Sequence, residues 1–141
     1  MDRVFLDANV LFSAAYRDES GLMRLWRIVD IELITSSYAV REAERNLATE
    51  AQRQRLTELL VKVTILGDAL AYDLPSGLTL PEKDVPIEAA AIHAGATHLV
   101  TGDKTHFGPL FGQMVSGVLI QPPADYLSDR AAYIQQDQPP L

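Results

Sequence analysis

Short apolar segments alternate along this chain with longer segments of helical spacing, and no other feature restricts the possible folds as strongly. The first apolar segment, residues 4–6, is apolar on both faces, as expected of a strand in the middle of a parallel sheet. Further strand-like segments follow at residues 31–35, 61–65, 98–101 and 115–121. This order predicts an α/β fold whose central sheet is mostly parallel and has about five strands.

Helix signals fill the segments between the expected strands. We expect one helix at residues 22–29, where Leu22, Leu25, Trp26 and Val29 share a face, and others at 38–47, 50–60 and 85–95. Ser36 and Ser37 are candidate N-caps, and Gly95 is a candidate helix stop. Proline-containing segments at 74–77 and 80–83 indicate a loop. With no repeat and no linker, we expect one domain over residues 1–134 and a disordered tail at 135–141.

The composition is that of an ordinary globular protein, and it excludes several kinds of site. The 141 residues are 48% apolar and 22% charged, which suits one domain with a single core. Because the chain has no cysteine, disulfides, thiol nucleophiles and cysteine-bound metals are excluded. Its apolar runs stay far below the roughly 18 residues that span a bilayer, and it has no basic leader followed by an apolar stretch. We therefore expect a soluble, cytoplasmic protein without membrane association.

The net charge of −7 is concentrated in the second half of the chain. Residues 1–62 contain nine Arg or Lys against ten Asp or Glu, and residues 63–141 contain three against nine. A protein that binds nucleic acid by bulk charge shows the opposite balance. Either the partner is not a polyanion, or bound cations neutralise some carboxylates while arginines of the first half form a local patch. The simpler interpretation is a solvated helix face paired with glutamates; the arginines concerned are Arg17, Arg24, Arg27, Arg41, Arg45, Arg53 and Arg55.

Two aspartates follow two of the expected strands. Asp7 comes directly after residues 4–6, and Asp103 follows residues 98–101 after one glycine. In open α/β sheets the ligand crevice lies at the carboxyl ends of the strands, where the strand order reverses. If these two strands are neighbours, both carboxylates face one crevice, and a hard divalent cation is the natural compensation for their charge. Taken singly, each aspartate is more simply a loop or helix-capping residue.

Two further acids stand near the starts of expected helices. Asp84 precedes the helix at 85–95, where it suits an N-cap, and capping does not prevent metal binding. Glu42 lies about one turn into its helix, where Arg45 is a natural surface partner. Helical spacing alone does not distinguish Glu42 from Glu44 as the residue that faces the crevice.

Five segments form an ordered set of motifs between residues 4 and 127: 4–11, 37–47 with Glu42, 80–92 with Asp84, 99–107 with Asp103, and 121–127. In this order they resemble the PIN-domain metal-dependent ribonucleases, and specifically the VapC-like toxins of bacterial toxin–antitoxin pairs. Each motif alone is weak, but the ordered set is fairly specific. The second motif selects Glu42 over Glu44. Two positions depart from the pattern: Ala8 replaces a hydroxyl residue of many relatives, and His106 stands where some carry an additional acid, which puts a full second metal site in doubt.

The resemblance implies a three-layer α/β/α fold with a pocket of four carboxylates, Asp7, Glu42, Asp84 and Asp103, that holds one or two Mg²⁺ or Mn²⁺ ions. Such ions lower the pKa of a bound water, shield the scissile phosphate from the acids and stabilise the leaving oxygen. The resemblance further implies endonucleolytic cleavage of an RNA substrate, inhibition by a small antitoxin protein, and a homodimer.

Three polar residues are candidates to support these carboxylates. Asn9 and Thr101 are placed to orient them, although turn or cap formation is the simpler role for a polar residue at a strand end. His106 is a candidate donor to a phosphate, although a solvent-exposed histidine is the simpler interpretation. Trp26 has core spacing and is expected to serve packing.

Two other functions remain open on sequence alone. A noncatalytic PIN-like binding module would be supported by a missing ligand, yet all four candidate acids are present. A receiver-type phosphoacceptor domain should pair acids near its first strand and place Lys-Pro after its last, whereas here Asp2 precedes the strand and Lys104 precedes Thr105. The three histidines lack the His-Glu-x-x-His spacing of a zinc hydrolase, and the segment 102–105 lacks the upstream glycine of a phosphate-binding loop.

Overall fold

Six strands form one sheet in the order β3-β2-β1-β4-β6-β5 in the computed structural model, which describes residues 1–67 and 85–137. All neighbouring strands are parallel except β5 and β6, which are antiparallel. The sheet is therefore mostly parallel, as predicted, with one strand more than the five expected. The strands are β1 (Asp2–Leu6), β2 (Ile31–Ser36), β3 (Val63–Leu66), β4 (His98–Val100), β5 (Met114–Val115) and β6 (Val118–Gln121).

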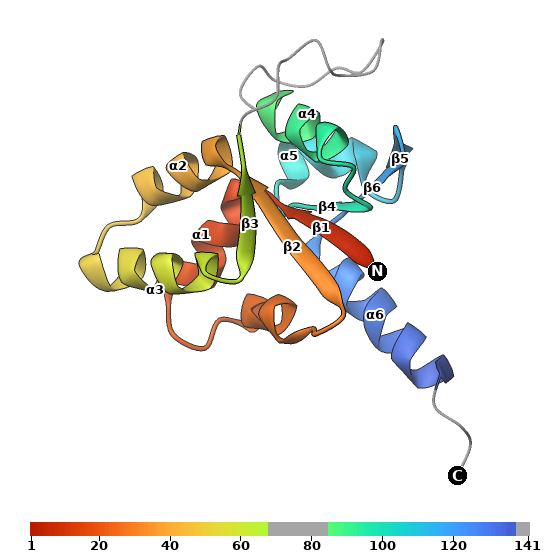
Figure 1. Cartoon of the computed structure of the whole chain (residues 1–141), viewed down its shortest axis with the longest axis horizontal. Helices are drawn as coiled ribbons and strands as arrows, with labels where there is room; N and C mark the ends of the chain where they lie inside the picture. The colour runs from red at the N-terminus through yellow and green to blue at the C-terminus, as the bar shows by residue number, and fades with distance from the viewer. Residues whose placement is uncertain (68–84, 138–141) are drawn as a thin grey trace.

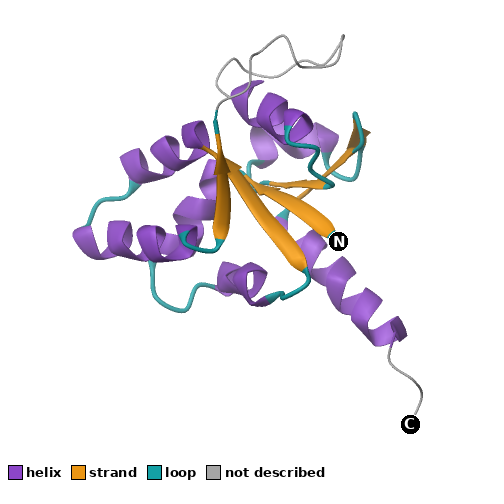
Figure 2. Ribbon diagram, viewed as in Figure 1, coloured by secondary structure: helices purple, strands orange, loops and turns teal. Residues whose placement is uncertain are grey.

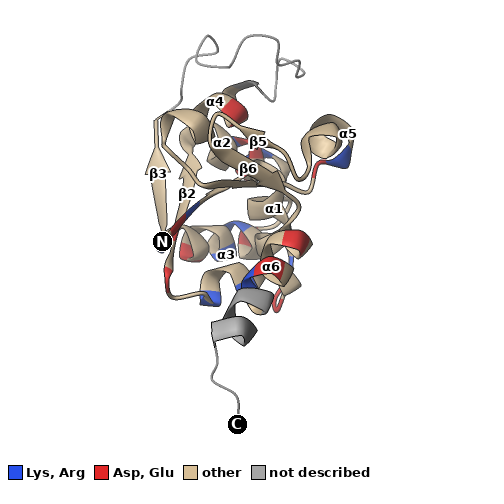
Figure 3. Ribbon diagram, turned by 90° about the vertical axis from the view of Figure 1, so that its right-hand side faces the viewer, with Lys and Arg blue, Asp and Glu red and all other residues tan. Residues whose placement is uncertain are grey.

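Helices cover both faces of the sheet (Figures 1 and 2). Figure 3 shows α1, α3 and α6 on one face and α4 on the other, which gives the predicted α/β/α layering. The helices are α1 (Ala8–Tyr16), η1 (Gly21–Arg27), α2 (Ser37–Asn46), α3 (Glu50–Leu60), α4 (Val85–His93), α5 (Lys104–Phe107), η4 (Gly108–Leu110) and α6 (Pro123–Asp137). In the described part of the chain, no helix is long and apolar enough to cross a membrane.

The order of the strands reverses between β1 and β4. From β1 the chain proceeds to β2 and β3 on one side, and then returns to β4 on the other side. The register pairs Leu6 with Val100, so both strands end at the same level of the sheet. The prediction that these two strands are neighbours is thereby confirmed, and the residues that follow them lie at a topological switch point.

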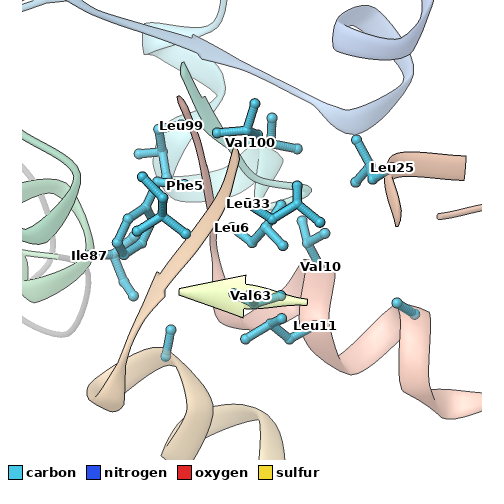
Figure 4. Close-up of a cluster of buried hydrophobic side chains, with 14 of the residues drawn as sticks. Phe5, Leu6, Val10, Leu11, Leu25, Leu33, Val63, Ile87, Leu99 and Val100 are labelled. Atoms are coloured by element: carbon cyan, nitrogen blue, oxygen red, sulfur yellow. The ribbon is translucent and has the colours of Figure 1, made fainter. Parts of the chain in front are cut away.

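The central strands are buried on both faces, which explains their uninterrupted apolar sequences. Phe5, Leu6, Leu99 and Val100 are fully buried, and Figure 4 shows them packed between α1 on one side and Ile87 of α4 on the other. Trp26 packs in the same core and donates its ring N–H to the carbonyl of Leu59 at 3.0 Å. Its predicted packing role is confirmed.

Helix ends follow the predicted signals at two positions. Ser36 caps α2, because its hydroxyl oxygen accepts a hydrogen bond from the N–H of Ala39 at 3.2 Å. Gly95 follows α4 with a φ of +68°, a left-handed conformation that favours glycine and ends a helix. The expected cap Asp84 and the loop segments at 74–77 and 80–83 lie outside the described residues.

Three local predictions were wrong, each for an identifiable reason. Val29 is 97% exposed, because the expected helix is a 3₁₀ helix that ends at Arg27 and loses the helical spacing. Val61 caps α3 instead of beginning β3. The single strand expected at 115–121 is a hairpin, since Ser116 and Gly117 both have positive φ and turn the chain, as a tight hairpin requires.

The last helix overlaps the segment for which the sequence predicts a tail. Helix α6 continues to Asp137, into the segment 135–141 that was expected to form a disordered tail. Residues 138–141 lie outside the described residues. No helix was expected at the position of α6, although Pro123 at its first position suits a helix start.

Candidate functional site

Asp7 lies at the switch point, immediately after β1. Its backbone N–H donates to the carbonyl of Val100 at 3.1 Å, which ties it to β4. Its side chain is the N-cap of α1 and accepts a hydrogen bond from the N–H of Ala8 at 2.6 Å. The residue is only 4% exposed. Its carboxylate therefore lies at the positive end of the α1 dipole.

A small hydrogen-bond network fixes the other oxygen of Asp7. The Thr101 hydroxyl donates to Asp7 Oδ2 at 2.7 Å, and the Asn9 amide donates to the same oxygen at 3.1 Å. Asn9 Oδ1 in turn accepts from the Gly102 N–H at 2.8 Å. A Cβ at position 102 would lie 3.3 Å from Asn9 Oδ1, so a glycine permits this close approach. Asn9 and Thr101 thus connect the ends of β1 and β4 through Asp7.

Asp103 is the second strand-end acid, and it is linked to the same network. Its N–H donates to the Thr101 hydroxyl at 3.1 Å, and its Oδ1 accepts from the His106 N–H at 3.1 Å, which caps α5. Its Oδ2 lies 2.8 Å from His106 Nδ1. The simpler interpretation of His106 as a solvent-exposed residue was wrong, because its side chain is 27% exposed and is held against Asp103.

Asp7, Glu42 and Asp103 line one pocket of about 540 Å³. Glu42 reaches it from α2, where its carboxylate also pairs with Arg45 at 2.8 Å. Glu44 is exposed and is not among the lining residues, so the fold distinguishes two glutamates that helical spacing did not. The lining residues are Asp7, Ala8, Asn9, Phe12, Tyr38, Glu42, Asn46, Ile87 and Asp103.

The side chains of this pocket suit a hard divalent cation, because carboxylate oxygens are the ligands that Mg²⁺ and Mn²⁺ prefer. Within residues 1–67 and 85–137, however, no three acidic or histidine side chains stand close enough together to hold a metal ion. The fourth predicted carboxylate, Asp84, lies outside the described residues. The four-carboxylate arrangement therefore stays a prediction, to which the fold contributes three acids in one pocket.

Glu88 is an acidic residue of this region that the sequence analysis missed. It lies on α4, is fully buried, and neither of its carboxylate oxygens has a hydrogen-bond partner in the described part of the chain. Burial, and secondly the charge of Asp7, raise its pKa to about 7. The available signal was its position inside the apolar run of α4, between Ile87 and three alanines, where an acid has no packing role.

A larger groove of about 760 Å³ lies next to the acidic pocket, between α1, η1 and α6. Phe12 lines both hollows. Among the residues that the structure describes, the groove is lined by Arg17 and Arg24 and by no acid. We therefore place the candidate chemistry in the smaller pocket, which has three described carboxylates, and treat the groove as an adjoining surface.

A separate group of charged residues lies at the other end of the sheet, beside the start of β1. The Tyr126 hydroxyl donates to Asp2 Oδ2 at 2.8 Å, and Arg130 of α6 pairs with Asp30. The hydrogen bond from Arg130 lowers the pKa of Asp30 below its usual value. These contacts attach α6 to the sheet.

The fold and the pocket together define a doubly wound α/β domain with an acidic site at its switch point. Residues 3–105 match the family model described as the PIN domain. The chain belongs to the PIN domain family. No curated protein matches it in sequence.

Several solved structures share the fold, among them these two. One is VapBC2 from Rickettsia felis bound to a DNA fragment from their promoter, with a TM-score of 0.65 and 16% identity over 85% of this chain and 98% of that chain. The other is VapC20 from Mycobacterium tuberculosis, a sarcin-ricin loop cleaving toxin, with a TM-score of 0.52 and 16% identity over 71% of this chain and 91% of that chain. At this identity the similarity establishes the fold alone.

Proposed function

We propose that this protein is a metal-dependent endoribonuclease of the PIN toxin type. The observation that carries the proposal is the meeting of Asp7, Glu42 and Asp103 in one pocket at the switch point of a PIN fold. VapC20, which shares the fold, is a toxin that cleaves the sarcin-ricin loop, and this supports RNA as the substrate class.

In this proposal Asp7, Glu42, Asp84 and Asp103 hold one or two Mg²⁺ or Mn²⁺ ions. When bound, such a cation supplies a water of lowered pKa and shields the scissile phosphate from the acids. Thr101 and Asn9 orient Asp7 through their hydrogen bonds to Oδ2. His106 holds Asp103 in place. No side chain of the chain has to act as the nucleophile.

The groove lined by Arg17 and Arg24 is suited to bind the RNA next to the acidic pocket. Arg17 and Arg24 line it, and the aromatic rings of Phe12 and Tyr16 lie there 5.4 Å apart. Phe12 also lines the acidic pocket, so a strand lying in the groove would continue to the acids. Aromatic rings and arginines are the groups that hold single-stranded nucleic acid without base specificity. We therefore assign RNA binding to these local arginines, because the net charge of −7 repels phosphate.

We infer a small antitoxin protein as the inhibitor, a homodimer as the oligomeric state and the cytoplasm as the location. The antitoxin is supported by the shared fold with VapBC2, which was crystallised with a DNA fragment from their promoter. Co-purification of the chain with the product of an adjacent small gene tests the antitoxin, and light scattering tests the dimer.

The direct test of the function is RNA cleavage by the purified protein in Mn²⁺ and in EDTA, beside Asp7→Asn. Asn is an equally good N-cap, so this variant keeps α1 and removes the charge. We expect the wild-type protein to cleave RNA in Mn²⁺ but not in EDTA, and Asp7→Asn to cleave RNA in neither. RNA binding without cleavage would instead indicate a noncatalytic PIN-like module.

A further inference from the structure

Glu88 is buried at a position where an acidic side chain does not stabilise the fold. It is fully buried, and both of its carboxylate oxygens lack a hydrogen-bond partner within the described residues. A buried polar group without a partner destabilises a protein, and a buried charge does so more strongly. The neighbours of Glu88 on α4 include Ala89 and Ala91, both fully buried, so a small apolar residue would suit this helix better. Local costs of this kind are typical of functional positions.

The surroundings of Glu88 connect it with the acidic pocket. Helix α4 packs against β2, β4 and α2, which are the elements that carry or precede Asp103 and Glu42. Ile87, the preceding residue, lines the pocket. The charge of Asp7 acts on Glu88 strongly enough to raise its pKa further. Glu88 itself is not among the residues that line the pocket, but it is the next residue along α4 after one that does, and it is near enough to Asp7 to be affected by its charge.

A divalent cation in the pocket would change the energetics of Glu88. It would offset the charge of Asp7, which opposes ionisation of Glu88, and it would attract the ionised carboxylate itself.

We propose that Glu88 is a further acidic residue of the cation site, which strengthens the binding of the cation held at Asp7 through its negative charge. This inference rests on the proposed function, because it requires that the pocket bind a cation. It assigns to α4 a contribution that the four-carboxylate set of the family does not include. Glu88 is here a positioning residue, since nothing places it against the substrate.

The test is the affinity for Mn²⁺, measured by isothermal titration calorimetry at pH 8 on the wild-type protein, Glu88→Gln and Glu44→Gln. Gln keeps the size and removes the charge, and the Glu44 variant removes an equal charge from an exposed position of α2 outside the pocket. We expect Glu88→Gln to bind Mn²⁺ about three- to tenfold more weakly, as expected for one nearby charge in a partly buried site, and Glu44→Gln to bind it as the wild type does. Circular dichroism establishes that each variant is folded, and Glu88→Ala replaces Glu88→Gln if the amide is not accommodated.

Two outcomes overturn the inference in distinguishable ways. If Glu88→Gln binds Mn²⁺ with wild-type affinity while Asp103→Asn does not, Glu88 is a structural residue only and the cation site stands. If the wild-type protein binds no Mn²⁺ at millimolar concentration, the proposed function fails, and this inference fails with it. An equal loss in Glu88→Gln and Glu44→Gln would show an effect of net charge and would also reject a specific role.

Discussion

Thr101 connects the two strand-end acids, because its hydroxyl donates to Asp7 and accepts from the N–H of Asp103. Thr101→Val keeps the shape of the side chain and leaves the buried Asp7 Oδ2 with one donor fewer. We expect a loss of about 1–3 kcal/mol in the free energy of unfolding and weaker Mn²⁺ binding and slower RNA cleavage. Denaturant titration and calorimetry measure the two effects.

The chain offers a matched control for this substitution. Thr35 is also fully buried, and its hydroxyl donates to the backbone carbonyl of Leu6 at 2.8 Å and not to a carboxylate, although Leu6 directly precedes Asp7. Thr35→Val should cost similar stability and leave Mn²⁺ affinity unchanged. If both variants lose Mn²⁺ binding equally, the effect is one of stability and the orienting role of Thr101 is rejected.

Glu88 also predicts how the stability of the metal-free protein depends on pH. Its pKa is raised in the folded state from 4.5 to about 7, so between these values the folded protein binds more protons than the unfolded one. This extra proton binding stabilises the folded state. The stabilisation is fully present below pH 4.5 and is lost as the pH rises through 7, and it contributes up to about 3 kcal/mol to the free energy of unfolding. In EDTA, Glu88→Gln should show a flatter decline of stability from pH 5 to pH 8 than the wild type. Parallel curves would contradict the raised pKa.

Replacing Asp103 should affect the stability and the activity of the protein in opposite directions. In the metal-free protein Asp103 shares its pocket with Asp7 and Glu42, and like charges repel one another. Asp103→Asn, which retains capping ability, should leave the unfolding temperature in EDTA equal or higher. Its RNA cleavage rate should fall by about 100-fold or more, as is common when a group that stabilises charge in the reaction is removed. Cleavage at the wild-type rate would remove Asp103 from the site.

At the scale of single elements, η1 carries two exposed arginines, Arg24 and Arg27, one turn apart. Arg24 is among the residues that line the groove beside the acidic pocket, and Arg27 is not. In an Asp7→Asn background, which prevents cleavage, Arg24→Ala should weaken binding of single-stranded RNA. It should also reduce the slope of log affinity against log salt by about 0.7, the value for one phosphate contact.

Arg27→Ala removes the same charge from the same helix and should leave the salt slope of RNA binding unchanged. Fluorescence anisotropy over a salt series measures both variants. Equal effects of the two substitutions would mean that RNA responds to overall charge, and the groove would lose its assigned role.

The elements differ in how well the sequence predicted them, and the difference has physical causes. β1 and β4 are buried on both faces, so their apolar runs identify them without ambiguity. The hairpin of β5 and β6 depends on two residues with positive φ, and only one of them is a glycine. The 3₁₀ geometry of η1 has three residues per turn, so the α-helical spacing assumed for Val29 did not apply.

The same distinction holds for the candidate site. The sequence predicted that Asp7 and Asp103 lie together, because their position depends only on strand order. Without the resemblance, the sequence does not distinguish Glu42 from Glu44, since both flank the buried face of α2. The sequence also did not indicate a role for Glu88, because the burial of an acid depends on how α4 packs. The contact of His106 with Asp103 depends on the single turn of α5, which spacing did not predict.

At the scale of the whole molecule, the fold separates two groups of acidic residues at opposite ends of the sheet. The candidate site collects Asp7, Glu42 and Asp103 at the carboxyl ends of the strands. The other end carries Asp2, Asp30 and Asp129 around Arg130. Because Arg130 pairs with Asp2 and Asp30, we expect this second group to bind no cation. A cation that binds only the folded protein, present at 100 times its dissociation constant, should increase the free energy of unfolding by about 2.7 kcal/mol. The unfolding temperature should therefore be higher with Mn²⁺ than in EDTA.

The location of the cation is the most direct test of this account. Nuclear magnetic resonance of the isotope-labelled protein, titrated with substoichiometric Mn²⁺, reports which amides lie near the bound ion through paramagnetic broadening. We predict that the signals of Asp7, Asp103 and Glu42 broaden first, together with that of Asp84, while those around Tyr126 stay sharp. Broadening centred on Asp2, Asp30 and Asp129, or no selective broadening at any position, would contradict a cation site at the switch point of the sheet.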